Sequence, residues 1–167
     1  MDAKRGSESA PMKNRTTVER KSDREVVVTR TINGPARIVF EAWTKPELFK
    51  QWWVPKSTNM SLRSCEMDVR VGGTYRLEFE PEGMAFFGTY LDVTPHSRLV
   101  WTNEESDEGS VTTVTFAEKG GKTLLVMHEL YPSKEALDAA GTGAAEAMGE
   151  TFDQLDALLV TLGALPA

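Results

Sequence analysis

The chain has 167 residues, which suits one domain with a terminal extension, and its 40% hydrophobic and 26% charged residues are ordinary for a globular protein. The net charge of −6 is uneven: residues 1–24 hold seven basic and four acidic side chains, a net +3, which leaves −9 for residues 25–167. An acidic body repels phosphate backbones, so no nucleic-acid binding is expected, and without an apolar run near ~20 residues no membrane insertion is expected.

Residues 1–23 are polar, contain Gly6 and Pro11, and show no apolar period. They predict a flexible N-terminal arm ahead of a domain spanning residues 24–167. A solvated tail is the favoured interpretation of the basic charge, and contact with an acidic surface is the alternative. Cys65 is the only cysteine, so it cannot form an internal disulfide. That suits a reducing compartment and predicts a cytoplasmic protein.

Regular structure is expected to begin with the β-branched stretch 24–32, a strand that ends in a turn at Asn33-Gly34-Pro35. Two short helices follow, opened by Pro35 and Pro46. From residue 60 to 131 the apolar period is two, with glycine- or proline-rich breaks, and loops this short predict an antiparallel meander. The expected strands are 60–69, 74–80, 85–93, 98–103, 110–116 and 123–130.

Ser133 can cap a final helix, because apolar residues recur at three- or four-residue steps from Leu137 to Leu162. The pattern predicts one helix of roughly 30 residues. Together the elements predict an α+β fold in which a curved antiparallel sheet grips this long C-terminal helix. The two short helices lie between the first two strands of the predicted order.

The two halves of this helix differ. The second half carries bulky residues, whereas residues 139–149 are mainly alanine and glycine. Small residues on a core face mean either that another element approaches closely or that the space opposite stays open. Because the facing strands carry large aromatics, we expect an apolar cavity; the alternatives are a tightly packed core or a locally broken helix. The residues expected to bind a ligand there are Trp53, Tyr75, Leu77, Phe79, Phe87, Trp101, Met127, His128, Glu129, Ala144, Met148 and Phe152.

His128 and Glu129 are adjacent on the last strand, so one faces the concave side and the other faces solvent. If Leu125 and Met127 point inward, Glu129 does so too. If Leu124 and Val126 point inward instead, His128 does. Periodicity cannot decide between them. The inward residue is a candidate hydrogen-bonding anchor or general base, and the alternative is a rim residue satisfied by backbone groups.

Other polar residues give weaker signals. With one cysteine and two histidines, no zinc site of the usual spacing can be written, and neither a metal nor a cofactor is expected. Cys65 is expected to be a small buried hydrophobe rather than a nucleophile served by His128. The tryptophans Trp43, Trp52 and Trp53 are expected to pack in the core or a lid, with ligand stacking as the alternative.

Several stretches, taken in order, resemble one family. They are PARIVFEAWTKPEL at 35–48, WWVP at 52–55, EMDVRVGG at 66–73, GTYLDVTP at 88–95 followed by RLVWT at 98–102, YPSKEA at 131–136 and TFDQL at 151–155. On these residues the chain resembles, over about residues 24–163, the bacterial activator-of-heat-shock-protein-90-ATPase-homologue family of the START-like (SRPBCC) helix-grip superfamily. The resemblance implies the helix-grip fold and a deep hydrophobic cavity. It does not imply one function, since relatives include lipid and polyketide binders, aromatase/cyclases and a co-chaperone domain.

Three functional hypotheses follow. The leading one is a carrier or sensor that binds a small hydrophobic molecule in the cavity. The second is a cyclase- or hydrolase-type enzyme, in which Glu129 or His128 moves protons in the same cavity. The third is a protein-interaction module with a chaperone contact, which predicts an exposed apolar patch instead. A homodimer is a further open alternative.

Overall fold

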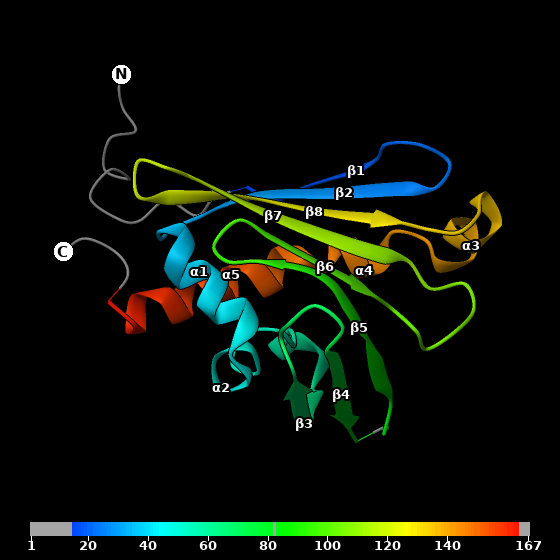
Figure 1. Ribbon diagram of the computed structural model, residues 1–167, viewed down its shortest axis with the longest axis horizontal. Coiled ribbons are helices and arrows are strands. Elements are labelled where there is room, and N and C mark those ends of the chain that lie inside the picture. Colours follow the sequence, from blue (N-terminus) through cyan, green and yellow to red (C-terminus); the bar gives the residue numbers. More distant parts are fainter. Residues whose placement is uncertain (1–14, 82, 164–167) are drawn as a thin grey trace.

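The computed structural model describes residues 15–163 except residue 82, as a curved sheet with helices along its concave side (Figure 1). The expected flexible arm lies, for residues 1–14, outside the described part. The elements are β1 (Thr17–Arg20), β2 (Glu25–Ile32), α1 (Ala36–Thr44), α2 (Pro46–Phe49), η2 (Lys56–Thr58), β3 (Ser61–Met67), β4 (Thr74–Glu80), β5 (Ala85–Thr94), β6 (Arg98–Thr102), β7 (Val111–Lys119), β8 (Lys122–Leu130), α3 (Lys134–Ala140), α4 (Gly143–Glu146) and α5 (Met148–Thr161).

All neighbouring strands pair antiparallel, in the order β1-β2-β8-β7-β6-β5-β4-β3. Strands β3 to β8 form the predicted meander, and β2 adds to its far side beside β8, with Val28 opposite Met127. The predicted α+β fold, a curved antiparallel sheet against a long C-terminal helix, is confirmed.

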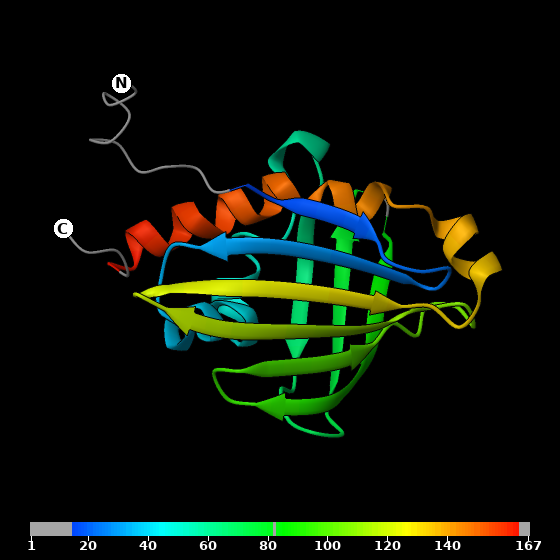
Figure 2. The same ribbon diagram turned by 90° about the horizontal axis from the view of Figure 1, so that it is seen from above.

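The sheet curves because the two halves of β5 pair with different strands. The first half pairs with β4, the second half pairs with β6, and the β5–β6 register shifts between Tyr90 and Asp92. Such an irregularity bends a strand. Gly88 lies at the bend, where an added Cβ would sit 1.9 Å from the carbonyl oxygen of Thr102, so only glycine lets the two strands approach this closely. As a result β3 and β4 cross the direction of the other strands (Figure 2).

Strand β1 differs from the expectation, which placed residues 17–20 in the arm. It pairs with β2, with Val18 opposite Val28, and Val18 packs against the core. Val18 is the single apolar residue of β1, so no alternation marks the strand in the sequence. Backbone pairing with β2 and side-chain contacts hold it in place, including an ion pair of 2.7 Å between Arg20 and Asp138.

The two short helices are confirmed, and they cover one end of the sheet's concave side (Figure 1). Pro46 begins α2 as expected, while Pro35 immediately precedes α1. Trp43 and Trp52 are buried here, and their ring centroids lie 4.9 Å apart. Core packing, the default interpretation of both residues, therefore holds in the structure.

The C-terminal helix is long but broken near its start. Ser133 caps α3 as predicted, accepting a hydrogen bond from the Ala136 amide at 3.0 Å. Gly141, with φ of +71°, then ends α3, and its amide donates to the Leu137 carbonyl at 2.7 Å. Beyond this break α4 and α5 follow one another through Ala147, whose φ and ψ are helical. The prediction of a single helix of roughly 30 residues is thus wrong in its first third, because Gly141 adopts a positive φ with ψ of −169°, an extended conformation open to glycine that ends α3.

A buried arginine connects β2 to α5. The Arg30 side chain is only 2% exposed, and its Nη2 lies 2.9 Å from Asp153 Oδ1 and 2.8 Å from Asp156 Oδ2. Its Nη1 donates to Thr16 Oγ1 at 2.8 Å. Asp156 also accepts a hydrogen bond from the Asn33 amide at 2.8 Å, so one cluster joins the N-terminal strands to the last helix.

Within the described residues, no helix combines the length and the apolar character that crossing a lipid bilayer requires.

Candidate functional site

A cavity of about 250 Å³ lies between the inner face of β2, β7 and β8 and the segment α3 to α5. A smaller apolar pocket of about 60 Å³ shares four of its lining residues, namely Trp53, Phe86, Trp101 and Asn103. The larger cavity is lined by Val26, Val28, Trp53, Phe86, Trp101, Asn103, Glu105, Thr112, Met127, Glu129, Tyr131, Ala140, Gly141, Ala144, Ala145 and Met148.

The helical wall of the larger cavity comes from the alanine- and glycine-rich segment. Ala140 and Gly141 line it at the break after α3, and Ala144 and Ala145 line it from α4. Met148, at the start of α5, is the first bulky side chain of this wall. Small side chains here leave the space opposite the sheet open.

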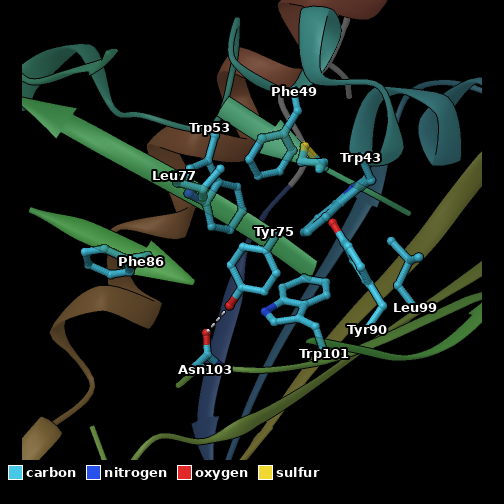
Figure 3. A pocket seen from close by; sticks show the side chains of 11 residues that line it. Trp43, Phe49, Trp53, Tyr75, Leu77, Phe86, Tyr90, Leu99, Trp101 and Asn103 are labelled. Carbon is cyan, nitrogen blue, oxygen red and sulfur yellow. Dashed lines mark hydrogen bonds between the residues drawn. The ribbon is translucent and has the colours of Figure 1, made fainter. Parts of the chain in front are cut away.

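The smaller pocket is lined largely by aromatic rings (Figure 3). Trp101 packs edge-on against Tyr75, with centroids 6.5 Å apart, and lies 5.9 Å from Trp43. Trp53 stacks on Phe49 at 4.8 Å. Trp53 and Trp101 also line the larger cavity, so these two tryptophans border both pockets.

The polar end of the larger cavity is built around Glu129. Its Oε1 accepts hydrogen bonds from Ser110 Oγ at 2.5 Å and from Thr112 Oγ1 at 2.8 Å. Asn103 Nδ2 donates to Thr112 Oγ1 at 2.9 Å, so the threonine hydroxyl directs its own hydrogen to the carboxylate. The single hydrogen of the Tyr75 hydroxyl is shared between the Thr102 carbonyl at 2.7 Å and Asn103 Oδ1 at 3.2 Å (Figure 3). A chain of hydrogen bonds therefore connects the two pockets.

The orientation of β8 resolves the question that periodicity left open. Leu125 and Met127 are buried on the inner face, and Glu129 lies on that face with them. His128 points to the opposite face, where its Nε2 lies 2.7 Å from Glu25 Oε2. His128 as a ligand-binding residue or general base in the cavity is therefore wrong, because alternation along the strand places it outside.

The surroundings of Glu129 on the inner face and of Glu25 on the outer face shift the pKa values of these two carboxyl groups in opposite directions. Burial raises the pKa of Glu129, and the Glu105 carboxylate adds to the rise, while the hydroxyl groups bonded to Glu129 and the charge of His128 oppose it. The pKa of Glu25 is lowered, chiefly by its hydrogen bond with His128. Tyr131 and Glu105 are further titratable residues that line the cavity.

Replacing Glu129 with glutamine is expected to raise the melting temperature by a few degrees at about pH 8, with the gain shrinking toward about pH 4. The folded protein holds the Glu129 proton to higher pH than the unfolded chain does. Between the two pKa values the folded state binds more protons, so the contribution of Glu129 to stability falls as pH rises. Thermal unfolding followed by circular dichroism across this pH range measures the effect.

The matched control is Glu25→Gln on the outer face. Because the pKa of Glu25 is lowered, its contribution to stability is present at high pH and is lost as pH falls. Glu25→Gln should therefore be less stable than the wild type at about pH 8 and should converge with it toward about pH 4. A Glu129→Gln variant that melts below the wild type at high pH would contradict our account of the site.

The other residues expected at the site divide into two groups. Trp53, Tyr75, Leu77, Trp101, Met127, Glu129, Ala144 and Met148 line one or both pockets. Phe79, Phe87 and Phe152 line neither. Phe152 is fully buried and Phe79 is 7% exposed in the core, so both fill space rather than border it. Phe87 faces outward, with the Arg76 guanidinium 5.6 Å from its ring centroid. These three expectations are wrong.

Phe86 takes the place expected for Phe87. It shares the inner face of β5 with Gly88 and Tyr90. The prediction took the other set of alternating residues as the inner face, and the predicted aromatic residue was therefore one position too late. Ser110 and Thr112 were also missed. Ser110 just before β7 and Thr112 on it occupy every second position together with the buried Val114 and Phe116, a pattern in the sequence that could have placed both hydroxyls inside.

Cys65 is half-buried on β3, and its Sγ lies 3.6 Å from Met67 Sδ. Burial raises the pKa of the thiol to about 11. Since the thiolate is the nucleophilic form, this agrees with the expectation of a small buried hydrophobe. In the part of the chain that the structure describes, no group of three histidine, cysteine, aspartate or glutamate residues could hold a metal ion.

The sequence profile described as Activator of Hsp90 ATPase homolog 1-like protein matches residues 33–160. The chain belongs to this family. Its fold is shared by a protein from Rhodobacter sphaeroides, 23% identical, with a TM-score of 0.81 over 89% of this chain and 99% of the other. A second relative in structure is protein NE0264 from Nitrosomonas europaea, 26% identical, with a TM-score of 0.75 over 86% of this chain and 99% of the other.

The fold of the Activator of Hsp90 ATPase homolog 1-like family also extends to CalU16 from Micromonospora echinospora. CalU16 is 19% identical, and the alignment covers 87% of this chain and 84% of that one, with a TM-score of 0.60. No curated protein matches the chain. The predicted family is thus confirmed, and these structures share the fold without assigning a ligand.

Proposed function

We propose that the protein binds a small lipophilic molecule in the cavity between the sheet and α3 to α5, as a carrier or sensor. The observation that carries the proposal is the cavity of about 250 Å³, whose wall is mostly apolar and includes a few polar side chains, among them the Glu129 carboxyl group held by two hydroxyl groups. Small-molecule sites in proteins commonly have this form: a largely apolar hollow with a few polar groups that orient the guest.

The composition of the helical wall supports the proposal. An open space in a core costs stability, because the residues around it lose packing contacts. Leucine at Ala144 or Ala145 would occupy part of that space, and alanine at both positions leaves it open. A guest molecule supplies the missing contacts.

The proposal is tested by titration with N-phenyl-1-naphthylamine, a neutral fluorescent probe. We expect saturable binding of one probe per chain, with energy transfer from Trp53 and Trp101, which line the cavity. Ala145→Phe places a ring at the half-buried helical wall and should weaken binding about tenfold or more. Ala147→Phe adds the same ring at an exposed position that does not line the cavity, and should leave the affinity within about twofold.

Thermal unfolding of both variants verifies that they fold. If Ala145→Phe overpacks the core and fails to fold, Ala144→Phe provides the substitution at a more exposed lining position. Absence of saturable binding to the wild type, or equal affinities of the two variants, would refute the proposal.

The enzyme hypothesis has one observation in its favour. Glu129 lines the cavity and burial raises its pKa, which are the conditions under which a carboxyl group can exchange protons with a bound guest. Proton abstraction from 5-nitrobenzisoxazole tests for such a base. An enzyme should accelerate this reaction in the wild type, lose the acceleration in Glu129→Gln and retain it in Glu25→Gln. A rate equal to that of Glu129→Gln would exclude Glu129 as a base for this probe.

A further inference from the structure

We infer that the cavity selects a lipophilic amine: a guest with an apolar body and a protonated amino group that pairs with Glu129. The inference rests on the proposed function, since it specifies the chemistry of the molecule bound in the same cavity. It follows from three observations, namely the charges that line the cavity, the direction of the hydrogen bonds to Glu129 and the tryptophans that line the same cavity.

The charged groups of the cavity wall are acidic. Two carboxyl groups line it, Glu129 on β8 and Glu105 in the loop between β6 and β7. The described residues that line it include no lysine, arginine or histidine, because His128 points to the outer face. A carboxylate guest would meet two like charges without a cationic partner, whereas an ammonium group would meet two opposite charges.

The hydrogen bonds at Glu129 leave one acceptor for the guest. Both hydroxyl donors, Ser110 and Thr112, reach the same oxygen, Oε1. Among the described residues, no donor is bonded to Oε2. At Glu129 the guest is therefore offered an acceptor, and the fitting partner is an N–H or O–H group. An ammonium group supplies both the donor and the compensating charge for a carboxylate that burial disfavours.

The aromatic residues add to the selection. Trp53 and Trp101 line the same cavity as Glu129, and the face of an indole ring attracts cations. A cavity lined by both indole rings and a carboxylate is thus suited to an alkyl or aryl ammonium group, and Val26, Val28 and Met148 offer apolar surface for its body.

Three molecules with the same eight-carbon chain test the inference: octylamine, octan-1-ol and octanoate, each titrated into the full chain at neutral pH by calorimetry. We expect octylamine to bind about tenfold tighter than octan-1-ol, and octanoate to bind most weakly. Glu129→Gln should remove about tenfold of the octylamine affinity and leave octan-1-ol within about twofold. Glu25→Gln makes the same chemical change on the outer face and should alter neither.

The outcomes separate this inference from the proposed function. If octan-1-ol or octanoate binds as tightly as octylamine, the preference for an amine is overturned and binding in the cavity stands. If octylamine is preferred but Glu129→Gln and Glu25→Gln weaken it equally, the preference arises from the overall negative charge and the role of Glu129 is overturned. If none of the three binds although N-phenyl-1-naphthylamine does, the inference is overturned and the proposed function stands; if the probe does not bind either, both fail.

Discussion

Replacing Phe152 with alanine should lower the free energy of unfolding by about 4 kcal/mol. Its side chain is fully buried on α5, and its ring centroid lies 6.4 Å from those of both Trp43 and Trp52. Removing the ring leaves a hole among large, rigid neighbours that cannot collapse into it. Denaturant unfolding followed by tryptophan fluorescence measures the loss.

The milder substitution Phe152→Leu separates packing from binding. Phe152 lines neither pocket, so a variant that remains folded should bind N-phenyl-1-naphthylamine within about twofold of the wild type. Should Phe152→Leu weaken the probe as strongly as Ala145→Phe does, Phe152 would belong to the ligand site after all.

Replacing Arg30 with alanine should cost about 3 kcal/mol, the lower end of the range for breaking a buried ion pair, because Asp153 is 33% exposed and Asp156 15% exposed. The substitution removes the cation from two carboxylates and from the hydroxyl of Thr16. Hydrogen exchange should show the largest loss of protection at the start of β1 and in the middle of α5, because Arg30 bonds Thr16 just before β1 and two aspartates of α5.

The matched control is Arg20→Ala. Arg20 also pairs with an aspartate, Asp138, at 2.7 Å, but both side chains are exposed, at 37% and 43%. Exposed pairs contribute little, so this variant should lose less than about 1 kcal/mol. Equal losses for the two arginine variants would show that Arg30 contributes no more than a surface ion pair.

The strands between residues 60 and 131 were predictable because two local signals agree there. Alternating apolar residues such as Tyr75, Leu77 and Phe79 mark the buried face, and turns such as Gly120-Gly121 separate the strands. The strand β1 and the break at Gly141 were not predictable in the same way. The first depends on pairing with β2, and the second on a glycine that the apolar period of the helix spans without interruption.

The candidate site was predictable in outline and not in register. Composition alone marks the helical wall, where Ala144 and Ala145 replace bulky residues. Which face of a strand points inward is harder to predict from the sequence, because both faces of β5 and β8 carry apolar residues. The choice between Phe86 and Phe87, and between His128 and Glu129, is made by long-range pairing in the sheet.

Side chains alternate between the two faces of β7 and β8, so the side chains that line the cavity can change without altering the backbone hydrogen bonds of the sheet. The ladder between the strands uses main-chain groups alone, so Thr112 and Glu129 face each other across it without taking part in it. A relative that carried a lysine at the position of Glu129 and a neutral residue at that of Glu105 could keep the same sheet while favouring an anionic guest. In this architecture a change of ligand charge requires only a few inward side chains to be exchanged.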